Sequence, residues 1–159
     1  MKSRCAFVLL ALGSLLLGAC NYDTALTPRP TRDVDSRLLG DWVITDKESG
    51  KAEAMQVRQL DKDHYVIALD GDIYSAYHSD FLGVSFLSVQ DLNAPERLFL
   101  YLTVTVSADG KQLTARTVST KVVPATTKGR NALQKLIKTN LASPSLFEEP
   151  LLFNRPAAP

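Results

Sequence analysis

Cysteine is almost absent from this chain, and both cysteines lie near its start. Among 159 residues, only Cys5 and Cys20 carry a thiol. A domain that begins after residue 20 therefore has no disulfide, no cysteine-ligated metal and no thiol nucleophile. Its stability must come from burial of its own apolar side chains.

Motifs of catalytic and nucleotide-binding sites are also missing. The sequence contains no Gly-x-Ser-x-Gly, no Gly-x-x-x-x-Gly-Lys and no Gly-x-Gly-x-x-Gly, which argues against a nucleophile elbow and against phosphate-binding loops. Asp70-Gly71-Asp72 lacks the further oxygen ligands of a calcium loop. The sequence therefore predicts no catalytic residue and no cofactor, and we expect a protein that is not an enzyme. An enzyme with an unrecognised site stays open as an alternative.

Histidine is scarce, with only His64 and His78 in the chain. Asp63-His64 and His78-Ser79-Asp80 fall on neighbouring predicted strands, but no His-x-His or His-x-x-x-His spacing accompanies them. A metal site needs two or three converging ligands with supporting partners. We predict no metal and interpret these residues as polar groups at strand ends.

An excess of positive charge is missing too. Without Lys2 and Arg4, 16 basic side chains face 17 acidic ones. A nucleic-acid-binding protein needs a basic stripe, so no nucleic-acid partner is expected.

The chain begins with the three-part pattern of a secretory signal peptide. Lys2 and Arg4 precede an apolar run that ends in small residues at Ala19. The run is about fifteen residues long, short of the roughly 20 that a membrane-spanning helix needs. Residues 1–19 are therefore predicted to be a signal peptide.

The four residues Leu-Gly-Ala-Cys that end at Cys20 resemble the lipobox of bacterial lipoproteins. The resemblance implies that the Cys20 thiol is joined to diacylglycerol, that residues 1–19 are removed, and that the freed amine takes a further acyl chain such as palmitate. Two or three acyl chains hold a protein firmly to a membrane. In Gram-negative lipoproteins, an Asp after the cysteine resembles an inner-membrane retention signal. The residue here is Asn21, so we expect a lipid-anchored protein of the cell envelope, on the outer membrane facing the periplasm if the cell is Gram-negative.

The residues after Cys20 show no apolar periodicity, and Pro28 and Pro30 interrupt any helix. We predict a flexible tether over 20–36, with a reach on the order of 20–25 Å. A single domain over 37–155 and a disordered tail over 156–159 complete the predicted organisation.

From Leu38 onward, short strand signals alternate with turn signals. The Asp70-Gly71 pair gives the strongest hairpin signal. The predicted strands cover 40–46, 54–60, 64–69, 73–79, 84–90, 97–106, 112–118 and 151–155. This spacing predicts a mainly β fold, an antiparallel meander of about eight strands that forms a small closed or partly open barrel.

The clearest strand signal covers 97–106, where aliphatic side chains alternate with aromatic residues and threonines. Successive side chains of a strand point to opposite faces. The aliphatic set should therefore face the core, and it comprises Leu98, Leu100, Leu102, Val104 and Val106. Late in the chain, Leu133, Leu136 and Ile137 recur at helical spacing, which predicts one α-helix before the last strand.

Gly40-Asp41-Trp42 opens the first predicted strand, and Arg155 ends the last. Together they resemble the pattern of lipocalin-like (calycin) barrels, in which a Gly-x-Trp packs beneath a basic side chain from the end of the barrel. The resemblance implies a structural role for Trp42 and Arg155, with a cation–π contact of roughly 0.5–2 kcal/mol. The helix departs from that pattern, because in lipocalins it follows the eighth strand. A Trp42 that simply fills the core remains the alternative.

Tyr74, Tyr77, His78 and Asp80 form the densest polar and aromatic cluster of the sequence. They are a candidate ligand or partner surface, and an ordinary half-exposed strand is the other interpretation. The leading hypothesis is a non-enzymatic lipoprotein that binds a hydrophobic small ligand or an envelope protein. A purely structural envelope lipoprotein is the alternative.

Overall fold

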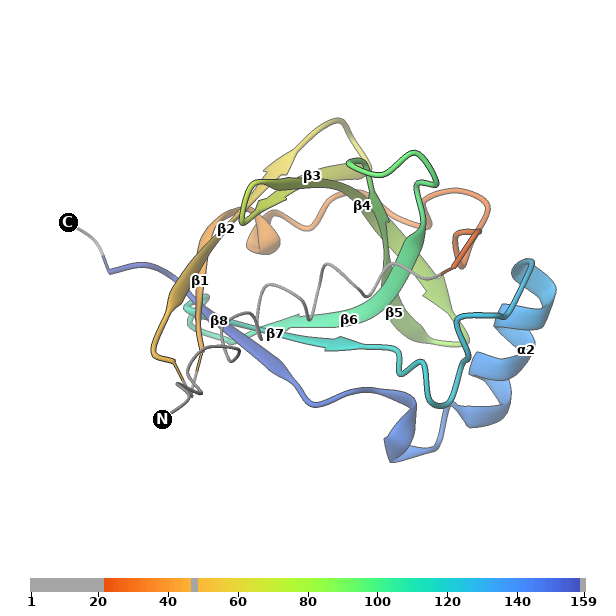
Figure 1. Ribbon diagram of the computed structural model, residues 1–159. Coiled ribbons are helices and arrows are strands. Elements are labelled where there is room, and N and C mark those ends of the chain that lie inside the picture. Colours follow the sequence, from red (N-terminus) through yellow and green to blue (C-terminus); the bar gives the residue numbers. More distant parts are fainter. Residues whose placement is uncertain (1–21, 47–48, 158–159) are drawn as a thin grey trace, which may run out of the picture.

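The computed structural model describes residues 22–46 and 49–157. Eight antiparallel strands follow one another around a closed barrel in the order of the sequence, and the last pairs with the first (Figure 1). The predicted fold class is confirmed, and the barrel is closed rather than partly open. The predicted signal peptide, residues 1–19, and Cys20 lie outside the described residues.

The strands are short, and one α-helix separates the last two. Their bounds are β1 (Gly40–Thr45), β2 (Ala52–Gln59), β3 (His64–Leu69), β4 (Asp72–Phe81), β5 (Val84–Asp91), β6 (Phe99–Val106), β7 (Gln112–Thr117) and β8 (Leu151–Asn154). The helix α2 covers Arg130–Asn140, and two 3₁₀ turns cover η1 (Ser36–Leu38) and η2 (Pro144–Leu146). Among the described residues, no helix is both long enough and apolar enough to cross a membrane.

The turns explain how the meander closes. Asp70 and Gly71, with φ of 49° and 90°, connect β3 to β4, the left-handed pair that a two-residue hairpin requires. The closing strand β8 pairs with β7 over four residues but aligns with β1 only at Val43 and Asn154. The ring is therefore continuous, with its shortest ladder between β8 and β1.

Inward-facing side chains form the main core. On β6, Leu100 and Leu102 are buried, and Val104 and Val106 pack against the same cluster, as the alternation predicts. The strand begins later than predicted, at Phe99, because Arg97 takes a positive φ of 46° in the preceding loop. Leu98 therefore falls before the strand.

A second apolar core lies outside the barrel wall. Phe86 and Tyr101 point away from the lumen and are fully buried beneath α2 and the N-terminal segment. The helix contributes Leu133 and Ile137, in agreement with the predicted helical spacing. The wall formed by β4, β5 and β6 is thus covered on both faces, which the sequence alternation alone does not reveal.

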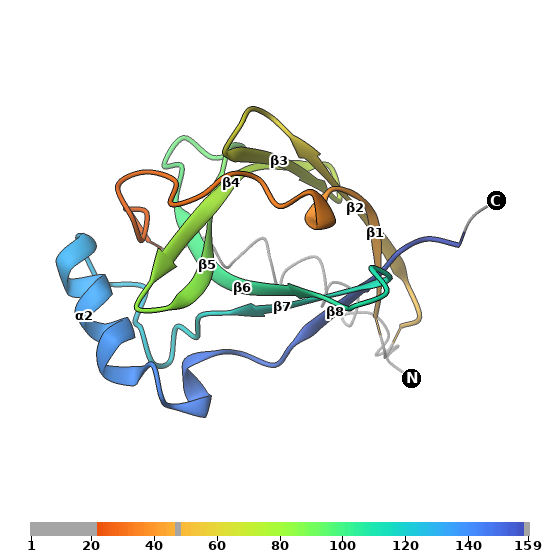
Figure 2. The ribbon, with the colours of Figure 1, turned by 180° about the vertical axis from the view of Figure 1, so that it is seen from behind.

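The prediction of a flexible tether over 20–36 is wrong for residues 22–36. The segment 22–39, here called the strap, runs along the outer wall and then across one end of the barrel (Figure 2). Tyr22 and Leu26 are buried in the outer core, and Thr27 donates to the hydroxyl of Ser79 at 2.8 Å. Leu38, in η1, is buried in the inner core. At the other terminus, Pro156 and Ala157 are exposed and outside any strand or helix, and the rest of the predicted tail lies beyond the described residues.

Candidate functional site

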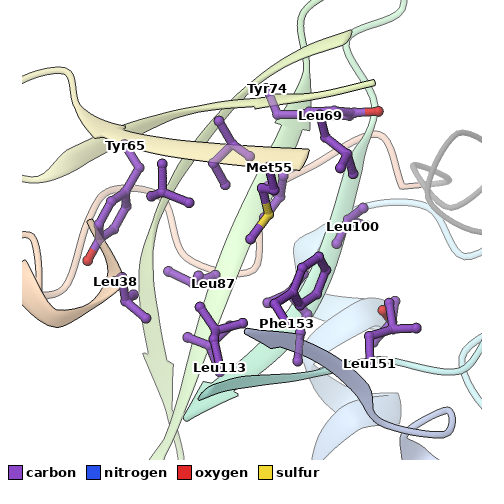
Figure 3. A pocket seen from close by; sticks show the side chains of 17 residues that line it. Leu38, Met55, Tyr65, Leu69, Tyr74, Leu87, Leu100, Leu113, Leu151 and Phe153 are labelled. Carbon is purple, nitrogen blue, oxygen red and sulfur yellow. The ribbon is translucent and has the colours of Figure 1, made fainter. Parts of the chain in front are cut away.

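An apolar cavity lies inside the barrel (Figure 3). Its volume is about 70 Å³, or about 740 Å³ when all the space between its atoms and its opening to solvent are included. All eight strands except β1 supply lining side chains, together with η1; the lining comprises Leu38, Met55, Val57, Tyr65, Ile67, Leu69, Tyr74, Leu87, Val89, Leu100, Leu102, Val104, Leu113, Ala115, Thr117, Leu151 and Phe153. The hydroxyl groups of Tyr65, Tyr74 and Thr117 are the only oxygen-bearing side-chain groups in this lining.

The two ends of the barrel differ. At the end that carries the β2–β3, β4–β5 and β6–β7 turns, the strap and η1 pass across the barrel, and Leu38 forms part of the cavity floor. We call this the capped end. The other end carries the β1–β2, β3–β4 and β5–β6 turns. Among the described residues, none forms a segment that passes across this end in Figure 1. We call it the uncapped end.

Trp42 and Arg155 hold the cap in place. The Arg155 guanidinium carbon lies 3.8 Å from the centre of the buried Trp42 ring. The same guanidinium donates to the backbone oxygens of Leu39 at 2.8 Å and Arg37 at 3.1 Å, and the Trp42 indole N–H donates to the oxygen of Leu38 at 2.9 Å. The contact implied by the calycin resemblance is therefore present, and it fixes η1 against the barrel.

A polar cluster fastens the strap beside this cap. The Tyr65 hydroxyl accepts from the backbone N–H of Asp35 at 2.6 Å and lies 2.8 Å from Nε2 of His78. On the other side of the imidazole, Arg32 lies 3.1 Å from Nδ1. Arg32 also pairs with Asp80 at 3.6 Å and donates to the hydroxyl of Ser85.

The charges of this cluster follow from its burial. His78 is 1% exposed, and desolvation, followed by the nearby Arg32 cation, lowers its pKa to about 4. Burial raises the pKa of the Tyr65 phenol. At neutral pH the imidazole and the phenol are both uncharged. His78 and Tyr65 therefore form a neutral hydrogen-bonded pair, and the Arg32 cation lies beside the imidazole. The Arg37 side chain, which hydrogen-bonds Asp35, lowers the pKa of that carboxyl group.

The structure separates the four residues of the predicted polar surface. Tyr74 lines the cavity. The other three bind the strap: the Tyr77 hydroxyl donates to the oxygen of Thr27 at 2.9 Å, the His78 oxygen accepts from the N–H of Thr31 at 2.9 Å, and Asp80 pairs with Arg32. The chain's own strap therefore covers the part of this surface formed by Tyr77, His78 and Asp80.

Asp61, Asp63 and His64 bring three potential metal ligands together at the β2–β3 turn. His64 lies 3.1 Å from Asp61 and 2.7 Å from Asp63. The backbone N–H groups of Asp63 and His64 also donate to Asp61, which is ordinary turn chemistry. Asp61 is exposed, Asp63 and His64 are half-buried, and their contacts are explained by the turn.

Sequence reasoning missed most of the cavity lining as a site. Met55, Leu87 and Leu113 look like core residues in the sequence because apolar alternation is the same for a filled core and for a hollow one. Only the closure of the barrel shows that these side chains do not fill the space between them.

Comparisons with models of protein families, with curated proteins and with solved structures each gave no match.

Proposed function

We propose that the protein is a lipid-anchored lipoprotein of the cell envelope that binds a hydrophobic small ligand inside its barrel, without chemical conversion of that ligand. The single observation that carries the proposal is the apolar cavity. A closed barrel of eight strands is just wide enough to be filled by side chains or to hold one small ligand, and this barrel leaves space inside.

The lining supports binding rather than catalysis. Ligand sites are typically concave, mostly apolar and equipped with a few polar groups that fix orientation. Here the lining is almost wholly apolar, and its only hydroxyl-bearing side chains are Tyr65, Tyr74 and Thr117. His78, the buried imidazole, is hydrogen-bonded to Tyr65 and Arg32 at the cap and is absent from the cavity lining. Transfer of one methylene group from water into such a cavity is worth about 0.8 kcal/mol.

The lipid anchor follows from the Leu-Gly-Ala-Cys segment that ends at Cys20. In this proposal Cys20 carries the lipid after residues 1–19 are removed, and the barrel lies on the periplasmic side of the outer membrane in a Gram-negative cell. The Gly40-Asp41-Trp42 pattern with Arg155 supports a likeness to calycin barrels, which is part of the proposal and not a family assignment.

The test is ligand titration with a matched pair of variants. Ala115→Phe adds a ring to the lumen, because Ala115 lines the cavity, whereas Thr114→Phe adds the same ring to the half-buried outer face of the same strand. We expect the unchanged protein to bind fluorescent n-alkyl probes, with the dissociation constant falling about fourfold per added methylene. Ala115→Phe should weaken binding by at least tenfold, and Thr114→Phe should leave it within twofold.

Circular dichroism and thermal unfolding of both variants would show that the barrel remains folded. The proposal fails if the unchanged protein binds none of the alkyl probes. It also fails if Ala115→Phe and Thr114→Phe weaken binding equally, because binding would then not take place in the lumen.

A further inference from the structure

The first described residue is fixed firmly to the barrel. Tyr22 and Phe99 exchange two backbone hydrogen bonds, of 3.1 and 2.8 Å. The Tyr22 hydroxyl donates to the oxygen of Val123 at 2.7 Å, and its ring stacks on Tyr101 with ring centres 4.9 Å apart. The Tyr22 side chain is 2% exposed, and burial raises its pKa to about 12. The chain is thus immobilised from residue 22 onward.

This fixed point lies at the rim of the uncapped end. Phe99 is the first residue of β6, which starts at the β5–β6 turn, and the next residue, Leu100, lines the cavity. Figure 2 shows the strap running from the outer wall towards the capped end.

Chain length then limits where the lipid can be. Cys20 precedes Tyr22 by two residues, and two residues span at most about 7 Å. A lipid on Cys20 must therefore leave the chain within about 7 Å of the Tyr22 backbone. The 20–25 Å of free reach that a tether over 20–36 would give does not exist, because the strap is part of the domain.

From this placement we infer that the uncapped end of the barrel faces the bilayer at close range, and that the cavity takes up the acyl chain of a membrane phospholipid. The inference rests on the proposed function and names its ligand class. The acyl chain enters first, towards the floor at Leu38, because the lining is apolar over its whole depth. The polar headgroup stays at the rim, where water and backbone groups can solvate it.

The charge of the rim selects the kind of lipid. The three turns of the uncapped end and the strand ends beside them carry, among the described residues, six acidic side chains and two basic ones: Asp46, Glu53, Asp70, Asp72, Asp91 and Glu96 against Lys51 and Arg97. An acidic rim is repelled by an anionic surface over about a Debye length, near 8 Å at physiological ionic strength. The structure therefore favours a zwitterionic phospholipid surface over an anionic one.

Two labelling positions test the orientation. Glu96 lies in the β5–β6 turn at the uncapped end, and Ala108 lies in the β6–β7 turn at the capped end; both are exposed. The full chain is produced by export in a bacterial host, so that Cys20 is lipidated and Glu96→Cys or Ala108→Cys supplies the free thiol for a fluorophore. Each protein is then reconstituted into phosphatidylcholine vesicles that contain a lipid with a nitroxide on its headgroup.

We expect the fluorophore at position 96 to be quenched at least threefold more strongly than that at position 108, because strands of six to ten residues separate the two ends by about 20 Å or more. Insertion of twelve Gly and Ser residues between Asn21 and Tyr22 restores about 20 Å of reach, and should remove the difference. Equal quenching at the two positions without the insertion, or stronger quenching at position 108, would overturn the inference.

Lipid uptake is measured on the same proteins. Transfer of a pyrene-labelled phosphatidylcholine from the vesicle to the barrel should be at least fivefold slower after the insertion, and should slow at least twofold when 30% phosphatidylglycerol is added. Binding of n-alkyl probes in detergent-free solution, by the exported Cys20→Ser chain, reports on the cavity alone. Probe binding without lipid transfer contradicts this inference and leaves the proposed function intact, whereas absence of both contradicts the proposed function itself.

Discussion

Gly40 and Arg155 occupy adjoining space at the capped end of the barrel: a β-carbon on Gly40 would overlap Nη1 of Arg155 and lie 3.3 Å from its Cζ. Gly40 also has a φ of +121°, a region that other residues rarely adopt. The guanidinium reaches the Trp42 ring and the strap only because this position has no side chain. The Gly-x-Trp pattern is thus explained by two separate requirements, backbone conformation and room for the cation.

Gly40→Ala should destabilise the protein by about 2–4 kcal/mol, because backbone strain and steric overlap both oppose it. Urea unfolding followed by Trp42 fluorescence measures the change. In an Arg155→Ala background the overlap is absent, so the same substitution should cost only the strain, about 1–2 kcal/mol. Identical costs in the two backgrounds would show that the two residues do not compete for space.

Arg155→Lys should cost about 1–2 kcal/mol, although it preserves the charge. Lysine lacks the planar guanidinium group, which donates to the backbone oxygens of both Arg37 and Leu39 while it lies over the indole ring. The release of η1 should also expose Trp42, so that its emission shifts to longer wavelength and acrylamide quenching rises. An unchanged Trp42 spectrum in a stably folded Arg155→Lys protein would contradict this role.

His78 should make the protein less stable in mild acid. The unfolded chain takes up a proton near the ordinary histidine pKa of 6.5, whereas the folded chain keeps His78 neutral until its lowered pKa of about 4. The contribution of neutral His78 to the free energy of unfolding is therefore complete above pH 6.5. It is lost as the pH falls towards 4, by up to about 3 kcal/mol.

Urea unfolding at intervals between pH 7 and pH 4 measures this dependence. His78→Gln keeps an acceptor for Arg32 and a donor for Tyr65, and should flatten the curve between pH 6.5 and pH 4. His64→Gln is the control, since His64 is partly exposed at the β2–β3 turn. The groups facing His78 are the charged side chains of Arg32, Asp35 and Asp80 and the hydroxyl groups of Tyr65 and Ser85.

The strap should behave as part of the domain in stability measurements. Leu26 is fully buried in the outer core, so Leu26→Ala should cost about 2–4 kcal/mol. Arg29→Ala, three residues further along, replaces an exposed side chain and should change stability by less than about 0.5 kcal/mol. If both substitutions had equally negligible effects on thermal unfolding, the strap would behave as a flexible tether and not as part of the domain.

The barrel itself was predictable because each strand carries its own signal. The alternation of Leu100, Leu102 and Val104 indicates which face of β6 is internal, and Asp70-Gly71 marks the β3–β4 hairpin without any knowledge of the remaining fold. These are short-range patterns that depend on local geometry.

The strap was not predictable because its contacts are long-range. Thr27 and Thr31 look like loop residues that flank two prolines, and their partners Ser79 and His78 lie about fifty positions away. The buried hydroxyl of Ser88, which receives the N–H of Leu26, looks like an outward-facing polar residue in the sequence. A buried polar side chain on the outer face of a strand becomes recognisable only when its covering segment is known.

The short ladder between β8 and β1 has a consequence for the order of folding. Strands β1 to β7 can pair through neighbouring hairpins, but the lumen forms only when Asn154 pairs with Val43. These two residues lie near opposite ends of the domain's sequence. Contacts between such distant parts of a chain form slowly, since a large loop must be closed first. Until then the inward-facing leucines lie exposed on an open sheet that is prone to aggregate, so closure of the ring is the step that buries them inside the barrel.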